Sequence, residues 1–351
     1  MSTERIIIIE NNEPTFNKLK EFIGNSGSYD IPIEYNEITD AIHQENGSSI
    51  SKLINSKIKE YGSEISAFII DLQLSDGISY GGIDATQQIR RKPDEVPYWR
   101  SIVPIIVYTQ YPNRKKQALE AGASTVIKKF SKLEDGQKLI ELKNSWKQKL
   151  DDHFSDTLLP QIKMYCEWYS DAMEKIRLSP LKLKEAVINF FISCRNKPEI
   201  KHAFIMTSFA SDYLGKIKDA AQAMEENYYV EAHIANTEGK IDDAIYAEVQ
   251  GHMYCCDFGI GVFFDDSSKG CTINPNLSIE VGFMMALEKP ICYLKDKKLN
   301  TYPIDLAHNH YTEYLNEEND KGLKNMEEAL FKWLDDTGTK NGIKKRETRI
   351  A

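Results

Sequence analysis

The sequence predicts an α/β protein with two doubly wound parallel-sheet domains joined by a helical segment. Short apolar runs alternate with amphipathic stretches from residue 5 to about residue 130, and the same alternation resumes after residue 201. Such alternation is typical of strand–helix units in a parallel sheet. The length of 351 residues fits two domains with a connecting segment, at a prior of roughly 150 residues per domain.

The N-terminal strands are expected at the apolar runs 6–9, 31–35, 67–70, 105–108 and 125–127. The run 31–35 is the weakest, because Pro32 lacks a backbone donor and suits an edge strand. These strands define a first domain over residues 1–130.

Residues 131–200 lack strand signals. Leu183, Phe190 and Cys194 recur at helical spacing, and Pro198 is expected to follow the end of the last helix. We expect this segment to be a helical linker that transmits a signal or pairs two copies in a homodimer.

Strand signals return at 203–206, 258–264 and 291–294, so a second α/β domain is expected over residues 201–335. Residues 336–351 form a basic tail. Its cationic residues are expected at a frayed, solvated chain end; they are Lys344, Lys345, Arg346 and Arg349.

Composition excludes several classes of protein. The net charge of -9 disfavours a nucleic-acid partner. No apolar run approaches the roughly 20 residues that span a bilayer, so no membrane partner is expected. The N-terminus lacks a secretory signal, which predicts a cytoplasmic protein. The six cysteines contain no Cys-x-x-Cys pair, so reduced, buried thiols are expected instead of zinc or disulfides.

Polar residues follow the predicted N-terminal strands at the points where those strands end. Glu10 and Asn11 follow the first, Asp71 follows 67–70, and Thr109 follows 105–108. The carboxyl ends of parallel strands face one crevice, so these side chains are expected together, with a lysine after the next strand. Carboxylates gathered there suit Mg²⁺, and one aspartate could attack a phosphoryl group.

This order of residues resembles the receiver domain of response regulators, over about residues 4–130. The segments that carry the resemblance are Glu10-Asn11-Asn12-Glu13-Pro14, Ile70-Asp71-Leu72, Tyr108-Thr109, and Ala121-Gly122-Ala123 ahead of Lys128-Lys129-Phe130.

The resemblance implies a flavodoxin-like fold, a phosphoacceptor at Asp71, and Mg²⁺ held by Glu10, Asn11 and Asp71. It also implies that Thr109 and Lys129 are the switch residues and that a histidine kinase acts upstream. Asn11 replaces an aspartate that is usual in the family, which lowers the expected metal affinity.

Two further departures concern the switch. The family's usual Lys-Pro step is missing, so Lys128 remains an alternative to Lys129, and Val126 stands at the aromatic switch position. A receiver-shaped domain that is not phosphorylated remains the alternative interpretation.

In the C-terminal domain, the strand 203–206 runs into a polar loop that contains Ser208 and Phe209. Such a loop can present backbone N–H groups to a phosphate or ribose, although Ser211 or Asp212 could equally be a helix N-cap. Asp265 follows the next strand on the same side of the sheet.

The segment 274–290 carries the strongest signal in this domain. Asn276 is expected to cap a helix, and the stretch 281–287 is apolar on every side, which predicts a buried helix. Glu280 is placed in its first turn. Burial would raise the pKa of Glu280 and the helix dipole would lower it, and a merely dipole-complementing glutamate is the alternative to a functional one.

Residues 201–300 resemble nucleoside 2-deoxyribosyltransferase-like and TIR-like nucleotide-binding domains. The resemblance implies that Glu280 acts on an N-glycosidic bond of NAD or a nucleoside, without a cofactor. It further implies that the substrate-binding residues are Ser208, Phe209, Asp265, Asn274 and Asn276. A non-catalytic nucleotide sensor and a protein scaffold are the alternatives.

Overall fold

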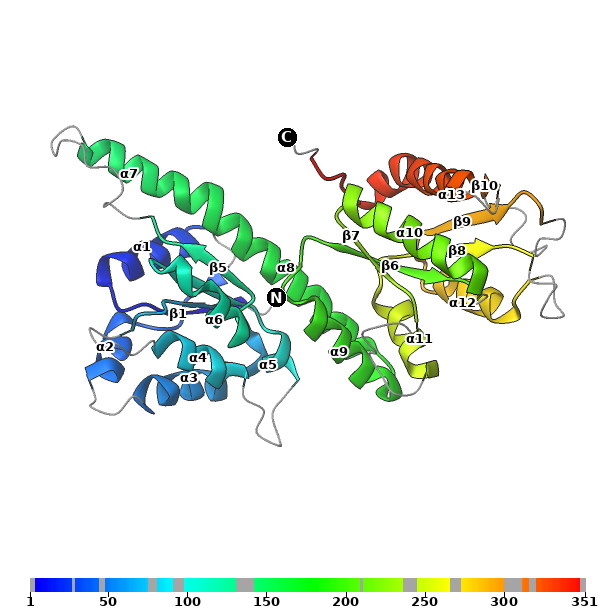
Figure 1. Ribbon diagram of the computed structural model, residues 1–351. Coiled ribbons are helices and arrows are strands. Elements are labelled where there is room, and N and C mark those ends of the chain that lie inside the picture. Colours follow the sequence, from blue (N-terminus) through cyan, green and yellow to red (C-terminus); the bar gives the residue numbers. More distant parts are fainter. Residues whose placement is uncertain are drawn as a thin grey trace. The chain divides into compact units, whose positions relative to one another are not determined.

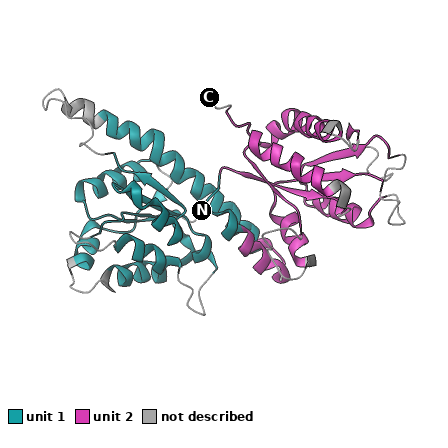
Figure 2. Ribbon diagram, viewed as in Figure 1, with its two compact units in different colours: residues 1–177, 191–198 teal, residues 178–190, 199–351 magenta. Residues whose placement is uncertain are grey.

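The computed structural model describes residues 4–26, 29–43, 48–74, 81–90, 98–130, 142–208, 211–235, 245–265, 273–299, 311–315 and 320–347. The chain forms two compact units (Figure 2). The first comprises residues 1–177 and 191–198, and the second comprises residues 178–190 and 199–351.

The first unit contains a five-stranded parallel sheet in the order β2-β1-β3-β4-β5. Figure 1 shows this sheet among its flanking helices. The strands are β1 (Glu4–Ile9), β2 (Tyr29–Asp30), β3 (Ile65–Ile70), β4 (Ile105–Thr109) and β5 (Thr125–Lys128). The predicted strand at 31–35 is wrong. Pairing with β1 ends at Asp30, and Pro32 could not donate a hydrogen bond to continue it. A helix begins soon afterwards, at Tyr35.

The helices of this unit are α1 (Glu13–Gly24), α2 (Tyr35–His43), α3 (Ser48–Tyr61), α4 (Gly81–Arg90), α5 (Trp99–Ile102) and α6 (Lys115–Glu120), with short 3₁₀ turns at Gly62–Glu64 and Pro112–Arg114. Asn12 fixes the start of α1, since its side chain accepts a hydrogen bond from Thr15 N. Residues of α4 and α6 pack on a small apolar cluster around Leu72 and Val107.

A long helix follows the first sheet. It runs through α7 (Leu142–His153), a π-helical turn η4 (Phe154–Leu158) and α8 (Leu159–Leu178), and a 3₁₀ turn at Leu181–Leu183 leads into α9 (Lys184–Cys194). The predicted helical character is confirmed for the described residues, while 131–141 lie outside them. The long helix packs on the first unit, where Tyr165 Oη donates to the carbonyl of Ser124 over 3.1 Å. The predicted boundaries at 130, 200 and 335 stay predictions.

The second unit repeats the topology of the first, with the parallel order β10-β9-β8-β6-β7. Its strands are β6 (Lys201–Met206), β7 (Val230–His233), β8 (Phe258–Phe263), β9 (Ile291–Asp296) and β10 (Thr312–Tyr314). The prediction of two doubly wound, flavodoxin-like sheets is therefore confirmed.

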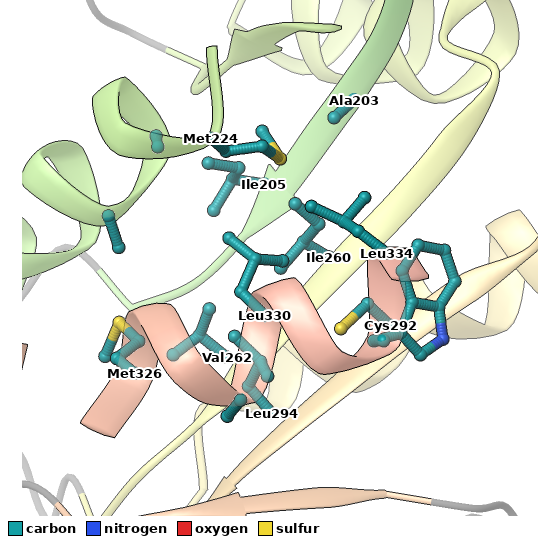
Figure 3. Close-up of a cluster of buried hydrophobic side chains, with 14 of the residues drawn as sticks. Ala203, Ile205, Met224, Ile260, Val262, Cys292, Leu294, Met326, Leu330 and Leu334 are labelled. Carbon is teal, nitrogen blue, oxygen red and sulfur yellow. The ribbon is translucent and has the colours of Figure 1, made fainter. Parts of the chain in front are cut away.

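Helices cover both faces of the second sheet. They are α10 (Ser211–Asn227), α11 (Ile245–Cys255), α12 (Pro275–Ala286) and α13 (Asp320–Trp333), followed by a π-helical turn (Leu334–Gly338) and a 3₁₀ turn (Thr339–Asn341). The main core lies between the sheet and the α10–α13 pair, where residues such as Ile205, Ile260 and Leu330 pack together (Figure 3).

The expectation of a frayed tail is wrong for residues 344–346. Lys345 pairs with Tyr228 in a β-bridge, and the Arg346 guanidinium donates to the carbonyls of Glu225 and Tyr228, both over 2.8 Å. Arg349 lies outside the described residues. Five cysteines are buried and free, as predicted, while Cys271 also lies outside. Among the described helices, none combines the length and apolar character of a membrane span.

Candidate functional sites at the two sheet edges

The first site lies where the order of the first sheet reverses. The neighbouring strands β1 and β3 both end there, and Glu10 and Asp71 follow them directly. The backbone N–H of Asp71 donates to the carbonyl of Ile9 over 2.9 Å, which extends the pairing to the last residue before the crevice. The chain therefore brings two carboxylates to adjacent positions.

Lys129 joins these carboxylates in a buried ion cluster. Its Nζ lies 2.6 Å from Glu10 Oε2 and 2.7 Å from Asp71 Oδ2. The three residues are at most 7% exposed. Charge-assisted contacts of this length are strong at a site with little water. With both acids ionised, the cluster keeps one net negative charge.

Burial raises the pKa of the Glu10 carboxyl, and the Lys129 ammonium opposes that shift. The other oxygen, Oε1, accepts a hydrogen bond from the backbone N–H of Asn12 over 2.9 Å. Glu10 is thus held by one cation and one amide, so its orientation toward the crevice is fixed.

Thr109 and Lys129 come from adjacent strand ends. The Lys129 N–H donates to the Thr109 carbonyl over 2.7 Å, and Thr109 is fully buried, with Oγ1 accepting from Tyr111 N over 3.2 Å. Lys128 is exposed. The geometry therefore favours Lys129 over Lys128 as the lysine of this site.

Asn11 is half-buried, and its backbone carbonyl accepts a hydrogen bond from Tyr35 Oη over 2.7 Å. Glu10, Asp71, Thr109 and Lys129 are therefore assembled as expected, with Asn11 next to them in the chain. Their functional roles stay predictions.

Gly82 is a site residue that the sequence analysis missed. A Cβ atom at this position would lie 2.0 Å from the Asp71 carbonyl oxygen, so only glycine allows α4 to approach the loop that begins at Asp71. The hydrogen bond from Gly82 N to the Leu72 carbonyl, over 3.1 Å, closes this contact. The sequence feature that could have indicated this role is the Gly81-Gly82 pair shortly after Asp71.

The donor set at the first site fits Mg²⁺. Glu10 and Asp71 supply buried carboxylate oxygens at one sheet edge, the ligands that hard cations prefer. The fit is that of a weak site, since Lys129 occupies one oxygen of each acid. Within the described ranges, no cluster of three His, Cys, Asp or Glu side chains is arranged to hold a metal ion.

The second site lies at the equivalent reversal point, between β6 and β8. Ser208 follows β6 and is buried, with 3% of its surface exposed. Asp265 follows β8 and is exposed. Phe209 lies outside the described residues, so its placement beside Ser208 stays untested.

Two glycines in β8 let α12 lie directly on the sheet. Cβ atoms at Gly259 and Gly261 would meet the side chains of Met284 and Val281 at 3.2 and 3.3 Å, respectively. Val281 and Met284 are fully buried by this packing. It also carries Glu280, the residue before Val281, into a partly desolvated position.

Burial raises the pKa of Glu280 from its ordinary value of 4.5 to about 7. The residue lies in the second turn of α12, not in the first as expected, because the helix begins at Pro275. The dipole acts mainly within the first turn, so burial prevails and the dipole-complementing interpretation loses its basis. Among the described residues, none forms a hydrogen bond or ion pair with Glu280.

Two further expectations for α12 are wrong. Asn274, not Asn276, caps the helix, since its side chain accepts from Asn276 N over 3.0 Å, and the Asn276 side chain is exposed. The helix is also not buried on all sides. Ile279 is 64% exposed and Met285 is 42% exposed. Because both faces of this helix are apolar, the sequence did not indicate that one face is buried and the other exposed.

Comparisons with known proteins found matches among solved structures. No protein-family model matches the chain, and no curated protein matches it. Among solved structures, the response regulator domain of Thermotoga maritima CheB is similar over 47% of this chain and 97% of its own, with 15% identity and a TM-score of 0.30. The Mn²⁺-bound response regulator Rcp1 is similar over 43% of this chain and 92% of its own, with 13% identity and a TM-score of 0.27. The phosphorylated cyanobacterial phytochrome response regulator RcpA has 14% identity over 44% of this chain and 95% of its own, with a TM-score of 0.26.

Proposed function

We propose that the chain is a signalling protein in which a receiver-like first unit controls a nucleotide-binding second unit. The observation that carries the proposal is the buried cluster of Lys129 with Glu10 and Asp71 at the reversal point of the first sheet. A buried nucleophilic carboxylate beside a lysine and a threonine suits acceptance of a phosphoryl group.

Asp71 is the proposed phosphoacceptor. Its Oδ2 faces Lys129, whereas within the described ranges Oδ1 makes a long contact of 3.5 Å with Gln73 N, so Oδ1 is the proposed oxygen for attack. Attack on the phosphorus of a phosphohistidine or acyl phosphate forms an acyl phosphate on Asp71. The bond to the leaving group breaks, and that group keeps the electron pair.

Lys129 and Thr109 would then hold the transferred group. The ammonium of Lys129 offsets the added negative charge, and the Thr109 hydroxyl donates to a phosphoryl oxygen. Glu10 and Asp71 would hold Mg²⁺, which supplies further positive charge against the phosphoryl oxygens when it is bound.

Acetyl phosphate with magnesium tests this assignment. The intact protein should gain the mass of one phosphoryl group, and Asp71→Asn should gain none. No labelling of either protein would leave a receiver-shaped domain that is not phosphorylated, which is the alternative interpretation. Equal labelling of both would place the phosphoryl group on a residue other than Asp71 and would overturn this assignment.

The second unit is proposed to bind NAD or a nucleoside at the β6–β8 crevice, with Glu280 beside the N-glycosidic bond. The supporting observation is the burial of Glu280 on α12, which packs on β8, with a pKa raised to about 7. A carboxylate there can stabilise positive charge on the sugar or attack the anomeric carbon. The proposed substrate contacts are Ser208, Phe209, Asp265, Asn274 and Asn276.

Incubation with NAD and with nucleosides separates three outcomes. Release of free base by wild type but not by Glu280→Gln supports an N-glycosidase. Saturable binding without release identifies a nucleotide sensor. A melting temperature that no nucleotide changes identifies a scaffold, because a ligand that binds only the folded form must stabilise it.

A further inference from the structure

An aromatic cluster lies directly behind the ion cluster of the first unit. Tyr108 precedes Thr109 in the chain, and Phe130 follows Lys129. The ring of His153 stacks on both, with centroid distances of 6.0 Å to Tyr108 and 6.1 Å to Phe130. The ring of Phe154 also lies 6.0 Å from that of Tyr108.

These contacts connect the two site strands with the long helix. His153 ends α7 and Phe154 begins the π-helical turn, and both pack on residues next to the switch positions Thr109 and Lys129. The helix is thus seated on the immediate neighbours of the site in the sequence.

The ion cluster touches the same aromatic group. Lys129 Nζ lies 5.8 Å from the centroid of the Tyr108 ring, which is within the range of a cation–π contact. The Tyr108 hydroxyl is hydrogen-bonded to the backbone of Phe130. Tyr108 and Phe154 are almost fully buried, at 2% and 1% exposure. A displacement of Lys129 must therefore be absorbed by Tyr108 or by Phe130.

The π-helical turn is the part of the long helix that could change its conformation when these aromatic rings move. A π-turn contains more residues than an α-turn, and such turns occur mostly as single insertions in α-helices, often at functional sites. A change at the turn can alter the register of the residues that follow without unfolding the helix.

We infer that Tyr108 and Phe130, through His153 and Phe154, couple the charge state of the Asp71 site to the π-helical turn at Phe154–Leu158. Loss of negative charge at Asp71 removes one of the two acids that hold Lys129, whereas addition of a phosphoryl group draws the ammonium toward the phosphoryl oxygens. Either change moves Lys129 from its position between Glu10 and Asp71. The aromatic rings then repack against the helix. This inference deepens the proposed function, because it names the route by which that site would act on the rest of the chain.

Amide hydrogen exchange on the full chain tests the coupling. Asp71→Asn changes the charge at the site without any phosphoryl donor. We expect exchange over residues 150–160 to change on the order of threefold or more in an otherwise wild-type protein. The same substitution in a Tyr108→Leu background should leave exchange there unchanged.

Phe22→Leu is the matched control, since the Phe22 ring packs on Phe154 at 5.5 Å from α1, which carries no group of the ion cluster. It can loosen the helix, but the response to Asp71→Asn should persist. If Tyr108→Leu does not fold, Phe130→Leu replaces it, because Phe130 is only partly buried.

The inference is overturned if Asp71→Asn leaves exchange at 150–160 unchanged in the wild-type background, or if its effect survives the loss of the Tyr108 or Phe130 ring. A failure of the proposed function looks different. In that case acetyl phosphate forms no adduct at Asp71, while the response to Asp71→Asn is still present and still depends on the rings.

Discussion

Lys129 and Asp71 are 58 residues apart in the chain, yet the lysine ammonium lies 2.7 Å from the carboxylate in a buried site. The same ammonium also forms an ion pair with Glu10. The three residues therefore form one ion-pair network, and the effects of substituting them on the free energy of unfolding should not be additive.

Lys129→Met should destabilise the first unit by about 3 kcal/mol at neutral pH, because it leaves two buried carboxylates without a cation. Lys128→Met is the control, since Lys128 is exposed and should cost less than about 0.5 kcal/mol. Urea unfolding at pH 7 measures both. Equal midpoints for the two variants would show that the cluster contributes nothing to stability.

Asn11→Asp should tighten the binding of Mg²⁺ by about tenfold, because it adds a negative charge next to Glu10. The control is Asn12→Asp, which places the same charge on the exposed cap of α1, where the side chain bonds to Thr15 N. Calorimetric titration with Mg²⁺ compares them. A similar gain in both variants would point to a general effect of net charge and not to a site at Asn11.

The sequence predicted the grouping of Glu10, Asp71, Thr109 and Lys129, although not of Gly82, because these four residues end or directly follow strands and strands with a clear apolar run are readable. Short strands with mixed polarity are not, so β7 and β10 were missed and β2 was misplaced. The face of α12 that meets the sheet depends on Gly259 and Gly261 in another element, so apolar composition alone overestimated its burial. Contacts between distant aromatic residues, such as Tyr108 and His153, left no periodic signal.

Gly82→Ala should destabilise the first unit by about 3 kcal/mol, because the new Cβ would overlap the backbone of Asp71 and Leu72. These backbone atoms cannot move out of the way of the new Cβ, whereas the end of a flexible side chain could. Gly24→Ala is the control, since a Cβ there meets nothing within 4 Å. Thermal unfolding should separate the two clearly, and phosphoryl labelling should also fail in Gly82→Ala if the Asp71 loop is displaced.

The second unit should lose stability in acid because of His252. Burial, with a smaller contribution from nearby His202, lowers the pKa of His252 from 6.5 to about 4. Between these two pH values, His252 is protonated in the unfolded chain and neutral in the folded chain. The contribution of His252 is present above pH 6.5 and is lost as the pH falls toward 4, a change of about 3 kcal/mol.

His252→Phe should flatten this acid dependence, since a phenyl ring can keep the stacking on Phe204, where the two ring centroids are 5.5 Å apart. Urea unfolding at pH 7.5 and pH 5 measures the effect. Parallel losses in wild type and variant between these two values would assign the acid sensitivity to other groups.

Glu280 should produce the opposite dependence. Its pKa is raised from 4.5 to about 7 by burial, so the folded chain holds a proton that the unfolded chain releases. Its contribution to stability is complete below pH 4.5 and is lost as the pH rises through 7, by about 2 kcal/mol after allowance for partial exposure. Glu280→Gln should therefore match wild type near pH 4.5 and exceed it at pH 8. Glu328→Gln, at an exposed position on α13, should follow wild type at both values. If Glu280→Gln is no more stable than wild type at pH 8, the carboxyl is ionised without cost, and the argument for a desolvated, functional glutamate at this crevice fails.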